Sequence, residues 1–340
     1  MSVNILGVET SCDETSAAVV VDGLNVSSNI ISSQIDVHRK FGGVVPEVAS
    51  RKHLEMINAV IQEALDEAKI GFEDLDAVAV TYGPGLVGAL LVGVAAAKAM
   101  SFALNVPLVG VNHLEGHVYA NFINNPGLNF PLLCLVVSGG HTDLVLINGY
   151  NDYNVVGRTR DDAAGEAFDK VARVLDLGYP GGPVIDKIAR KADPTAIKLP
   201  RAYLEEGSLD FSFSGLKTAV VNYAHKAKQR GETVDKENLA AGFQQAVVDV
   251  LVDKAIAAAK KYNTPVLMLA GGVAANALLR RQLWERANAE GMELVYPPLI
   301  LCTDNAAMIA CAGYHKYLRK NFAPLTLNAV PNLKLGEDKY

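Results

Sequence analysis

The stretch NILGVETSCDETSAAVVV, residues 4–21, decides the fold class, because two apolar β-rich runs flank a short polar turn. A further strand is predicted at 25–33, an amphipathic helix near 53–69 and a strand at 77–82. A helix then runs to about residue 104, and the strand PLVGV follows it. Strands that alternate with helices indicate an α/β protein.

The second half of the chain begins in the same way. PLLCLVV and TDLVLI flank the polar turn SGGH, and a strand near 153–158 follows. Helices are predicted near 163–176, 181–192, 214–229 and 237–262, and the strand PVLMLA then leads into GGVAANALLRRQL. Each half opens with strand, small polar turn, strand, strand and helix, which indicates a duplication at the level of topology. A chain of 340 residues also suits two lobes better than one core.

Composition restricts the function classes. Hydrophobic residues make up 50% and charged residues 20%, which is typical of a globular protein. The formal net charge of −6 argues against a dedicated nucleic-acid coat protein, so any RNA contact is local or shared with a partner. The basic clusters at 226–230 and 280–281 are interpreted as solvated helix faces, with RNA contact as the alternative.

Three further patterns bear on the cellular setting. Four scattered cysteines, with no C-x-x-C pair, indicate a reducing compartment without a disulfide framework. No signal peptide is seen in MSVNILGVETS, so a cytoplasmic location is expected. The uncharged run 77–97 is interrupted by Pro84 and three glycines, and is interpreted as strand, turn and buried helix, not as a membrane span.

A metal site is predicted around GVNHLEGHVYAN, residues 110–121. His113 and His117 stand four residues apart, so on a helix they lie on one face and can reach one ion. Glu115 lies about 200° around the helix from His113, which argues against the H-E-x-x-H protease motif. Asp304 in LCTDNAAM is either a helix N-cap or a third ligand, and two histidines with one carboxylate leave open positions on a metal.

Four glycine-rich or polar turns follow strands. GPGLVG, residues 83–88, has the form of a dinucleotide fingerprint but lacks the acidic residue about 20 positions later, so NAD is not expected. TSCDETS, residues 10–16, suits a β-turn or a phosphate or metal contact. VVSGGHTD, residues 136–143, suits a hairpin or an anion-binding nest. AGGVAAN, residues 270–276, would let a nucleotide approach the backbone.

Together these motifs resemble one family. The chain is similar to the universal tRNA N6-adenosine threonylcarbamoyltransferases in their bacterial form, formerly described as glycoproteases. The resemblance runs from residue 5 to about 308 and is carried by ILGVETSCDETS, FGGVVPEVASRKH, GPGLVGALLVG, HLEGH, LVVSGGHT, GEAFDKVAR, YPGGPVID, FSFSGLKT, GGVAAN and TDNAAM.

The resemblance implies an actin, Hsp70 and sugar-kinase type of fold, with two related lobes and a nucleotide cleft between them. The expected lobes are residues 1–130 with about 303–340, and residues 131–302. It also implies transfer of a threonylcarbamoyl group from threonylcarbamoyl-AMP to N6 of adenosine 37 in tRNAs that read ANN codons.

Site residues follow from the resemblance by motif. One divalent metal, usually assigned as Fe²⁺ with zinc as the alternative in purified protein, would be held by His113, His117 and Asp304. Proton removal from the acceptor amine falls to Asp13 or Glu14. The implied substrate contacts are Val136, Val137, Ser138, Gly139, Gly140, Asp169, Gly182, Asp186 and Asn276.

The implied partners are tRNA, a smaller paralogue without the metal and a P-loop ATPase. The small-residue helix 86–100 is the candidate paralogue contact, and a buried helix of its own lobe is the alternative. Two other functions are open: an ATP-dependent small-molecule kinase or ATPase of the same fold, and a non-catalytic partner subunit. The kinase does not explain the histidine pair, and a degenerate partner would be expected to lose it.

Overall fold

The computed structural model describes residues 2–339, which form two compact units. The first unit contains the chain up to Phe130, the short segment Gly149–Tyr153 and the chain from Pro297 onwards. The second unit contains Pro131–Asn148 and Asn154–Tyr296. Each unit is built on one five-stranded mixed sheet.

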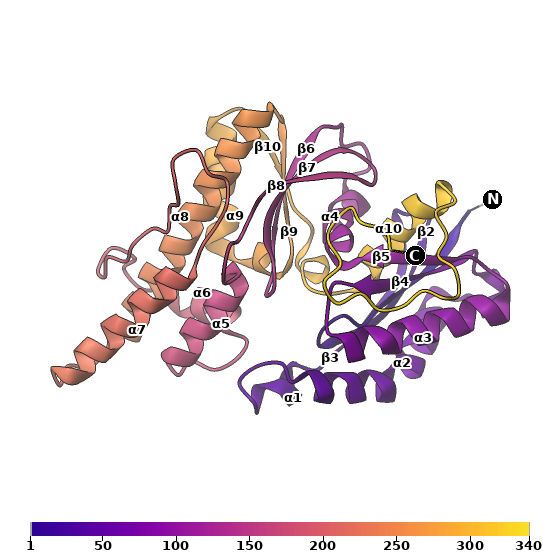
Figure 1. Cartoon of the computed structure of the whole chain (residues 1–340), viewed down its shortest axis with the longest axis horizontal. Coiled ribbons are helices and arrows are strands. Elements are labelled where there is room, and N and C mark those ends of the chain that lie inside the picture. Colours follow the sequence, from indigo (N-terminus) through magenta and orange to yellow (C-terminus); the bar gives the residue numbers. More distant parts are fainter. Residues whose placement is uncertain (1, 340) are drawn as a thin grey trace. The chain divides into compact units, whose positions relative to one another are not determined.

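The first unit, in which β2, β3, β4 and β5 are labelled in Figure 1, has the strand order β3-β2-β1-β4-β5. The neighbours β1–β2 and β2–β3 are antiparallel, and β1–β4 and β4–β5 are parallel. The strands are β1 (Asn4–Glu9), β2 (Glu14–Val21), β3 (Asn25–Ser33), β4 (Ala77–Gly83) and β5 (Leu108–Asn112). The helices are α1 (Ile35–Arg39), α2 (Pro46–Ala68), α3 (Val87–Leu104), α4 (His113–Asn124) and α10 (Ala306–Leu318).

The second unit repeats this plan with the order β8-β7-β6-β9-β10. Here β6–β7 is antiparallel, and β6–β9 and β9–β10 are parallel. The predicted duplication of topology is therefore confirmed. The strands are β6 (Leu132–Val137), β7 (Thr142–Gly149), β8 (Asp152–Arg158), β9 (Val266–Ala270) and β10 (Glu293–Val295). The helices are α5 (Ala164–Val174), α6 (Gly181–Ala189), α7 (Ser214–Gln229), α8 (Lys236–Tyr262) and α9 (Ala277–Ala289).

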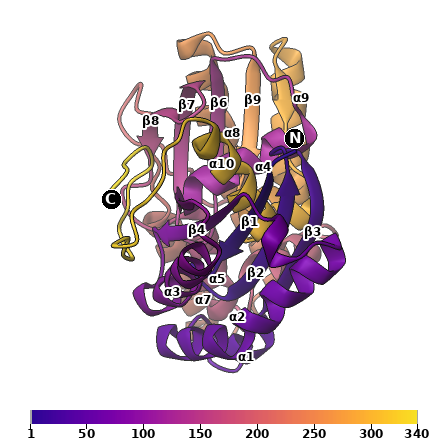
Figure 2. The ribbon, with the colours of Figure 1, turned by 90° about the vertical axis from the view of Figure 1, so that its right-hand side faces the viewer.

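Strand β1 separates two layers of the first unit. Leu6 and Val8 point into a core shared with α2 and α3. Gly7 faces the opposite layer, where α10 packs on the sheet (Figure 2). A Cβ atom at Gly7 would lie 2.3 Å from the carbonyl oxygen of Ala306. The missing side chain therefore lets the beginning of α10 rest directly on β1.

Helix α3 is strongly apolar in composition. Among the described residues it is the one helix long and apolar enough for a membrane span, with a mean hydropathy of 1.9. Core helices pass the same test, and α3 packs against β4 and α2. Its buried residues are Ala89, Leu90, Val92, Gly93, Val94, Ala97 and Ser101. These contacts agree with the expected buried helix.

Candidate metal centre

Both histidines of the predicted metal site lie on α4, at the carboxyl end of β5. Asn112 ends the strand and caps the helix, because its Oδ1 accepts the backbone N–H of Leu114 at 2.9 Å. His113 is the first residue of the helix and His117 follows one turn later. Both side chains are buried, with exposed fractions of 7% and 1%.

Asp304 joins them from the other end of the sequence. Its Oδ1 lies 3.4 Å from His113 Nε2 and 3.2 Å from His117 Nε2. The three ligand atoms lie within 4.8 Å of one another. The N-cap of α10 is the next residue, Asn305, whose Oδ1 accepts the N–H of Met308. Asn305, and not Asp304, therefore caps α10. The carboxylate of Asp304 remains available to a metal.

The donor set fits a divalent transition metal. Both ring nitrogens of His117 are buried and make no hydrogen bond, although Nε2 lies 3.2 Å from Asp304 Oδ1. A buried polar atom without a partner is costly, and a metal bond to one nitrogen would satisfy it. Two imidazoles and one carboxylate also leave positions open for substrate.

His113 is oriented by a second set of residues. Its Nδ1 lies 3.0 Å from Glu9 Oε2 and 3.1 Å from Ser11 Oγ. Glu9 is fully buried at the end of β1, and its carboxylate also accepts the hydroxyl of Thr81 and the backbone N–H of Ser11. A carboxylate on one imidazole nitrogen leaves the other, Nε2, for a metal. Sequence reasoning missed Glu9, although a charged residue that ends an apolar strand was a signal.

Electrostatics at the site favour a positive charge. Burial opposes ionisation of His113, but the carboxylates of Asp304 and Glu9 outweigh it and raise its pKa well above the ordinary value. Burial likewise opposes ionisation of Asp304 and Glu9, yet the charge of His113 keeps the pKa of both carboxyls below their ordinary values. In the metal-free protein a proton on His113 supplies this charge, so a metal cation would replace a proton.

Glu115 points away from these ligands, as the helix geometry predicts. Its Oε2 lies 3.2 Å from Nζ of Lys316, and both side chains are buried. The carboxylate is therefore engaged in an ion pair and does not face the His113–His117 side of α4. This arrangement does not support the general base of a zinc protease.

Asp13 ends the turn from β1 to β2 and Glu14 is the first residue of β2, also in the first unit. Asp13 is buried, with an exposed fraction of 8%. Glu14 Oε1 accepts the hydroxyl of Ser33 at 3.1 Å. Burial, together with the charges of Asp13 and Asp304, raises the pKa of Glu14 well above its ordinary value. Their catalytic role stays a prediction.

The predicted substrate contacts all lie in the second unit. Strand β6 ends at Val136 and Val137, and pairs with β9 up to Val136 and Ala270. Gly271 follows with a φ of +90°, where a Cβ would lie 2.4 Å from the Val137 carbonyl oxygen. The turn Ser138–Gly140 and the segment that leads to Asn276 therefore leave the same edge of the sheet. Gly139 and Gly140 face open space.

Helices α5 and α6 carry the remaining contacts. Asp169 Oδ1 accepts the N–H of Gly181 at 2.7 Å, which ties α5 to the beginning of α6. Asp186 is buried, with one oxygen 2.7 Å from Arg190 and the other without a partner. Asn276 caps α9 and donates to Gln244. These residues are held firmly, and their contact with substrate stays a prediction.

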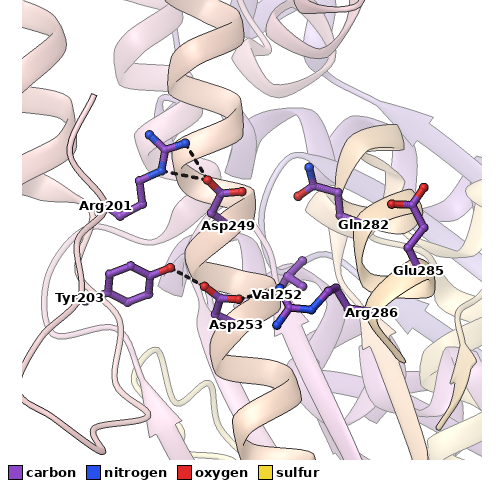
Figure 3. A pocket seen from close by; sticks show the side chains of 8 residues that line it. All are labelled: Arg201, Tyr203, Asp249, Val252, Asp253, Gln282, Glu285 and Arg286. Carbon is purple, nitrogen blue, oxygen red and sulfur yellow. Dashed lines mark hydrogen bonds and ion pairs between the residues drawn. The ribbon is translucent and has the colours of Figure 1, made fainter. Parts of the chain in front are cut away.

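A separate pocket of about 380 Å³ opens on the second unit, and none of the predicted site residues lines it (Figure 3). Four of its charged side chains form two ion pairs: Arg201 binds Asp249 at 2.6 Å, and Arg286 binds Asp253 at 3.0 Å. It is lined by Arg201, Tyr203, Asp249, Val252, Asp253, Gln282, Glu285 and Arg286. Sequence patterns gave no signal for it, because the lining comes from three separate segments.

Comparison with known proteins decides the family. A family model described as tRNA N6-adenosine threonylcarbamoyltransferase matches residues 25–311. A curated relative of that name from Desulfitobacterium hafniense is 62% identical over 334 residues, which cover 98% of each chain. The chain belongs to the tRNA N6-adenosine threonylcarbamoyltransferase family. A second threonylcarbamoyltransferase, from Moorella thermoacetica, is 60% identical over 98% of this chain and 97% of its own.

Solved structures support the fold of this threonylcarbamoyltransferase. HypF from T. kodakarensis matches with a TM-score of 0.63 and 13% identity, over 96% of this chain and 50% of its own. Component A of the Acidaminococcus fermentans (R)-2-hydroxyglutaryl-CoA dehydratase matches with a TM-score of 0.55 and 15% identity, over 93% of this chain and 99% of its own. The predicted two-lobe fold class of the actin, Hsp70 and sugar-kinase type is confirmed.

Proposed function

We propose that this chain transfers a threonylcarbamoyl group from threonylcarbamoyl-AMP to N6 of adenosine 37 in tRNAs that read ANN codons. The single observation that carries the reaction is the near full-length identity of 62% with a relative of that name. The sequence resemblance adds the donor, the position in the tRNA and the codon class. A cytoplasmic location fits this substrate.

The metal centre consists of His113, His117 and Asp304, with Glu9 behind His113. It is proposed to hold Fe²⁺, with Zn²⁺ as the alternative in purified protein, because imidazole nitrogens suit both ions. When bound, the cation supplies positive charge for the phosphate of the departing AMP. Glu9 and Ser11 keep the His113 ring in one orientation, so no reorganisation of that ligand is needed during the reaction.

Proton removal is assigned to the turn between β1 and β2. The amine nitrogen forms a bond to the carbamoyl carbon, the bond to the AMP oxygen breaks, and one amine proton must leave. Glu14 is proposed as the acceptor, because its raised pKa makes its ionised form a stronger base than an ordinary carboxylate. Burial is the largest cause of that raised pKa, and the charge of the neighbouring Asp13 raises it further.

The nucleotide part of the donor is assigned to the second unit. Backbone N–H groups of Gly139 and Gly140, in the open turn after β6, suit a phosphate. Asp169, Gly182, Asp186 and Asn276 would fix the rest of the donor, as the resemblance implies. The buried oxygen of Asp186 without a partner is a ready acceptor for a substrate hydroxyl.

Two protein partners are proposed from the same resemblance: a smaller paralogue without the metal and a P-loop ATPase. The paralogue is assigned to the outer face of α3, where Val87, Leu91 and Phe102 are 54%, 44% and 75% exposed. Leu54 of the neighbouring α2 is 65% exposed. Large exposed apolar side chains on two helices that pack against each other are typical of a protein interface.

The proposed reaction is tested by offering two substrate pairs to the purified chain with its partners. One pair is threonylcarbamoyl-AMP with unmodified tRNA, and the other is ATP with a panel of small-molecule acceptors. We expect AMP release and modified adenosine from the first pair only. Phosphorylated product from the second pair, without transfer in the first, would establish the kinase alternative instead.

A further inference from the structure

A chain of three charged side chains, buried at Glu115 and Lys316 and exposed at Asp338, lies behind α4. Glu115 Oε2 is 3.2 Å from Lys316 Nζ, and the same Nζ is 2.7 Å from Asp338 Oδ1. Lys316 is 1% exposed and Glu115 is 3% exposed. Asp338 also accepts the side-chain N–H of Asn321 at 2.8 Å. An ammonium group buried to this degree needs its carboxylates, because burial without them is very costly.

The C-terminal segment also reaches the cap of α4. The side-chain amide of Asn112 donates to the carbonyl oxygen of Lys334 at 3.0 Å. The backbone N–H of Asn112 points to Glu115 Oε2 at 3.4 Å and completes the capping box. The first turn of α4 is therefore held by the chain beyond Val330 at two places, once directly and once through Lys316.

This segment is itself well anchored. The buried hydroxyl of Tyr82 donates to the carbonyl of Glu337 at 3.3 Å and accepts the N–H of Lys339 at 3.2 Å. Leu327 and Leu333 are buried in the core shared with α2 and α3. Anchors on both sides give Asp338 a fixed position from which it can hold Lys316.

The two sides of α4 are held by the two ends of α10. Asp304 lies two residues before α10 and meets the histidines, whereas Lys316 lies in its last turn and meets Glu115. Glu115 is about 200° around α4 from His113. A rotation of α4 about its axis would therefore change the distances from both histidines to Asp304, and it would also break the ion pair on the opposite face.

We propose that Lys316 is a positioning residue for the metal centre and that the C-terminal segment, through Asp338, holds it in place. This inference rests on the proposed metal centre. Without Asp338, Glu115 would be the one carboxylate that pairs with Lys316. The ammonium group would then pull the Glu115 carboxylate away from the backbone N–H of Asn112, and the capping box of α4 would be lost. The histidines would then present their nitrogens to the metal less accurately.

Titration of the metal-free full chain with Co²⁺, followed by its visible absorption, tests the proposal. We expect Asp338→Asn to raise the Co²⁺ dissociation constant about tenfold, as other residues behind metal ligands do, and to shift the absorption bands. Asp338→Glu should restore most of the affinity. Glu290→Gln, which removes the exposed pair with Lys260 in the second unit, is the matched control and should bind as wild type.

A second variant separates positioning from general stability. Glu115→Gln with Lys316→Met removes both buried charges together, so neither is left alone, and we expect a folded protein with weakened Co²⁺ binding. Variants that melt at lower temperature but bind Co²⁺ within about twofold of wild type would overturn the positioning role. Absence of Co²⁺ binding by the wild-type chain would instead overturn the proposed metal centre and this inference with it.

Discussion

His113 has two carboxylates, Glu9 on Nδ1 and Asp304 near Nε2, and this arrangement distinguishes a metal ligand from an ordinary buried histidine. A core histidine needs one acceptor for its single N–H. A second carboxylate at the other nitrogen is favourable only if a cation, proton or metal, lies between them. Burial lowers the pKa of His113, but these two carboxylates raise it well above the ordinary value. The site therefore favours a positive charge between them.

Loss of either ligand should empty the metal centre. We expect His113→Ala and Asp304→Ala to abolish stoichiometric metal content without loss of the circular dichroism spectrum. The exposed His225→Ala on α7 is the control. Full metal occupancy in either ligand variant would show that the ion binds elsewhere.

Glu9 allows a finer test, because it supports His113 without belonging to the proposed ligand set. Glu9→Gln keeps the shape of the side chain and removes its charge, so His113 becomes a weaker donor. We expect the metal dissociation constant to rise about tenfold or more. Calorimetric titration would measure this, and an unchanged constant would argue against the Glu9–His113 pair as a support of the metal.

His315 should control part of the acid sensitivity of the fold. Burial and the charge of Arg319 lower its pKa from an ordinary 6.5 to about 4, and its Nε2 is buried without a partner. Since the unfolded chain binds the proton more readily, stability is complete above pH 6.5 and is lost as the pH falls through 4, by on the order of 2 kcal/mol. Urea denaturation across this range should show a smaller loss in His315→Phe, which keeps the stacking on Tyr150. An equal loss in both proteins would contradict this.

At the scale of elements, α3 has one face that packs inside its own unit and one face that is exposed. Gly93 belongs to the inner face, where a Cβ would lie 2.5 Å from the hydroxyl oxygen of Thr10. That hydroxyl donates to the carbonyl of Ala89 and cannot move without loss of its bond. Leu91 and Phe102 belong to the outer face. The sequence left open whether this helix is buried in its own lobe or contacts the smaller paralogue. Its inner face can pack in the core while its outer face binds the paralogue.

Substitutions on the two faces should therefore behave differently. We expect Gly93→Leu to lower the melting temperature by many degrees, since overpacking a tight site costs about 1–3 kcal/mol or more. We expect Phe102→Asp to melt as wild type and to lose binding to the smaller paralogue in a pull-down or calorimetric assay. Normal paralogue binding by Phe102→Asp and Leu91→Asp would remove α3 from the interface.

Regular periodicity made most elements predictable. The helix predicted at 214–229 agrees with α7, Ser214–Gln229, and the strand at 25–33 agrees with β3. Helix α2 begins at Pro46 rather than near 53, because its first two turns bury only Ala49 and so lack an apolar stripe. The short strand β10 was not predicted, because three residues are too few to show the alternation of apolar and polar side chains that indicates a strand.

The site was predictable only where its residues are close in sequence. His113 and His117 share a helix, and their spacing alone indicated a metal. Glu9 is 104 residues from His113, and Asp338 is 22 from Lys316, so no local pattern joins them. The sequence left Asp304 open between an N-cap and a third ligand, and the resemblance implied the ligand. The structure was needed to show that Asn305, and not Asp304, caps α10.

At the scale of the whole molecule, the net charge of −6 limits what the chain does alone. Affinity for tRNA rests largely on neutralisation of phosphates by Lys and Arg. We expect weak tRNA binding by the isolated chain and little turnover until the paralogue and the ATPase are added, measured by filter binding and by product formation. Full multiple-turnover transfer by the chain alone would reject this dependence.

The most direct measurement is the amount of threonylcarbamoyladenosine formed at position 37 of an ANN-decoding tRNA. Wild-type protein, His113→Ala and Asp304→Ala would each be incubated with threonylcarbamoyl-AMP, the tRNA and the same partners, and the digested nucleosides would be quantified by mass spectrometry. We expect modified adenosine from the wild type and a loss of at least about a hundredfold in both variants. Equal product from wild type and variants would contradict the claim that His113, His117 and Asp304 form a metal centre for transfer to tRNA.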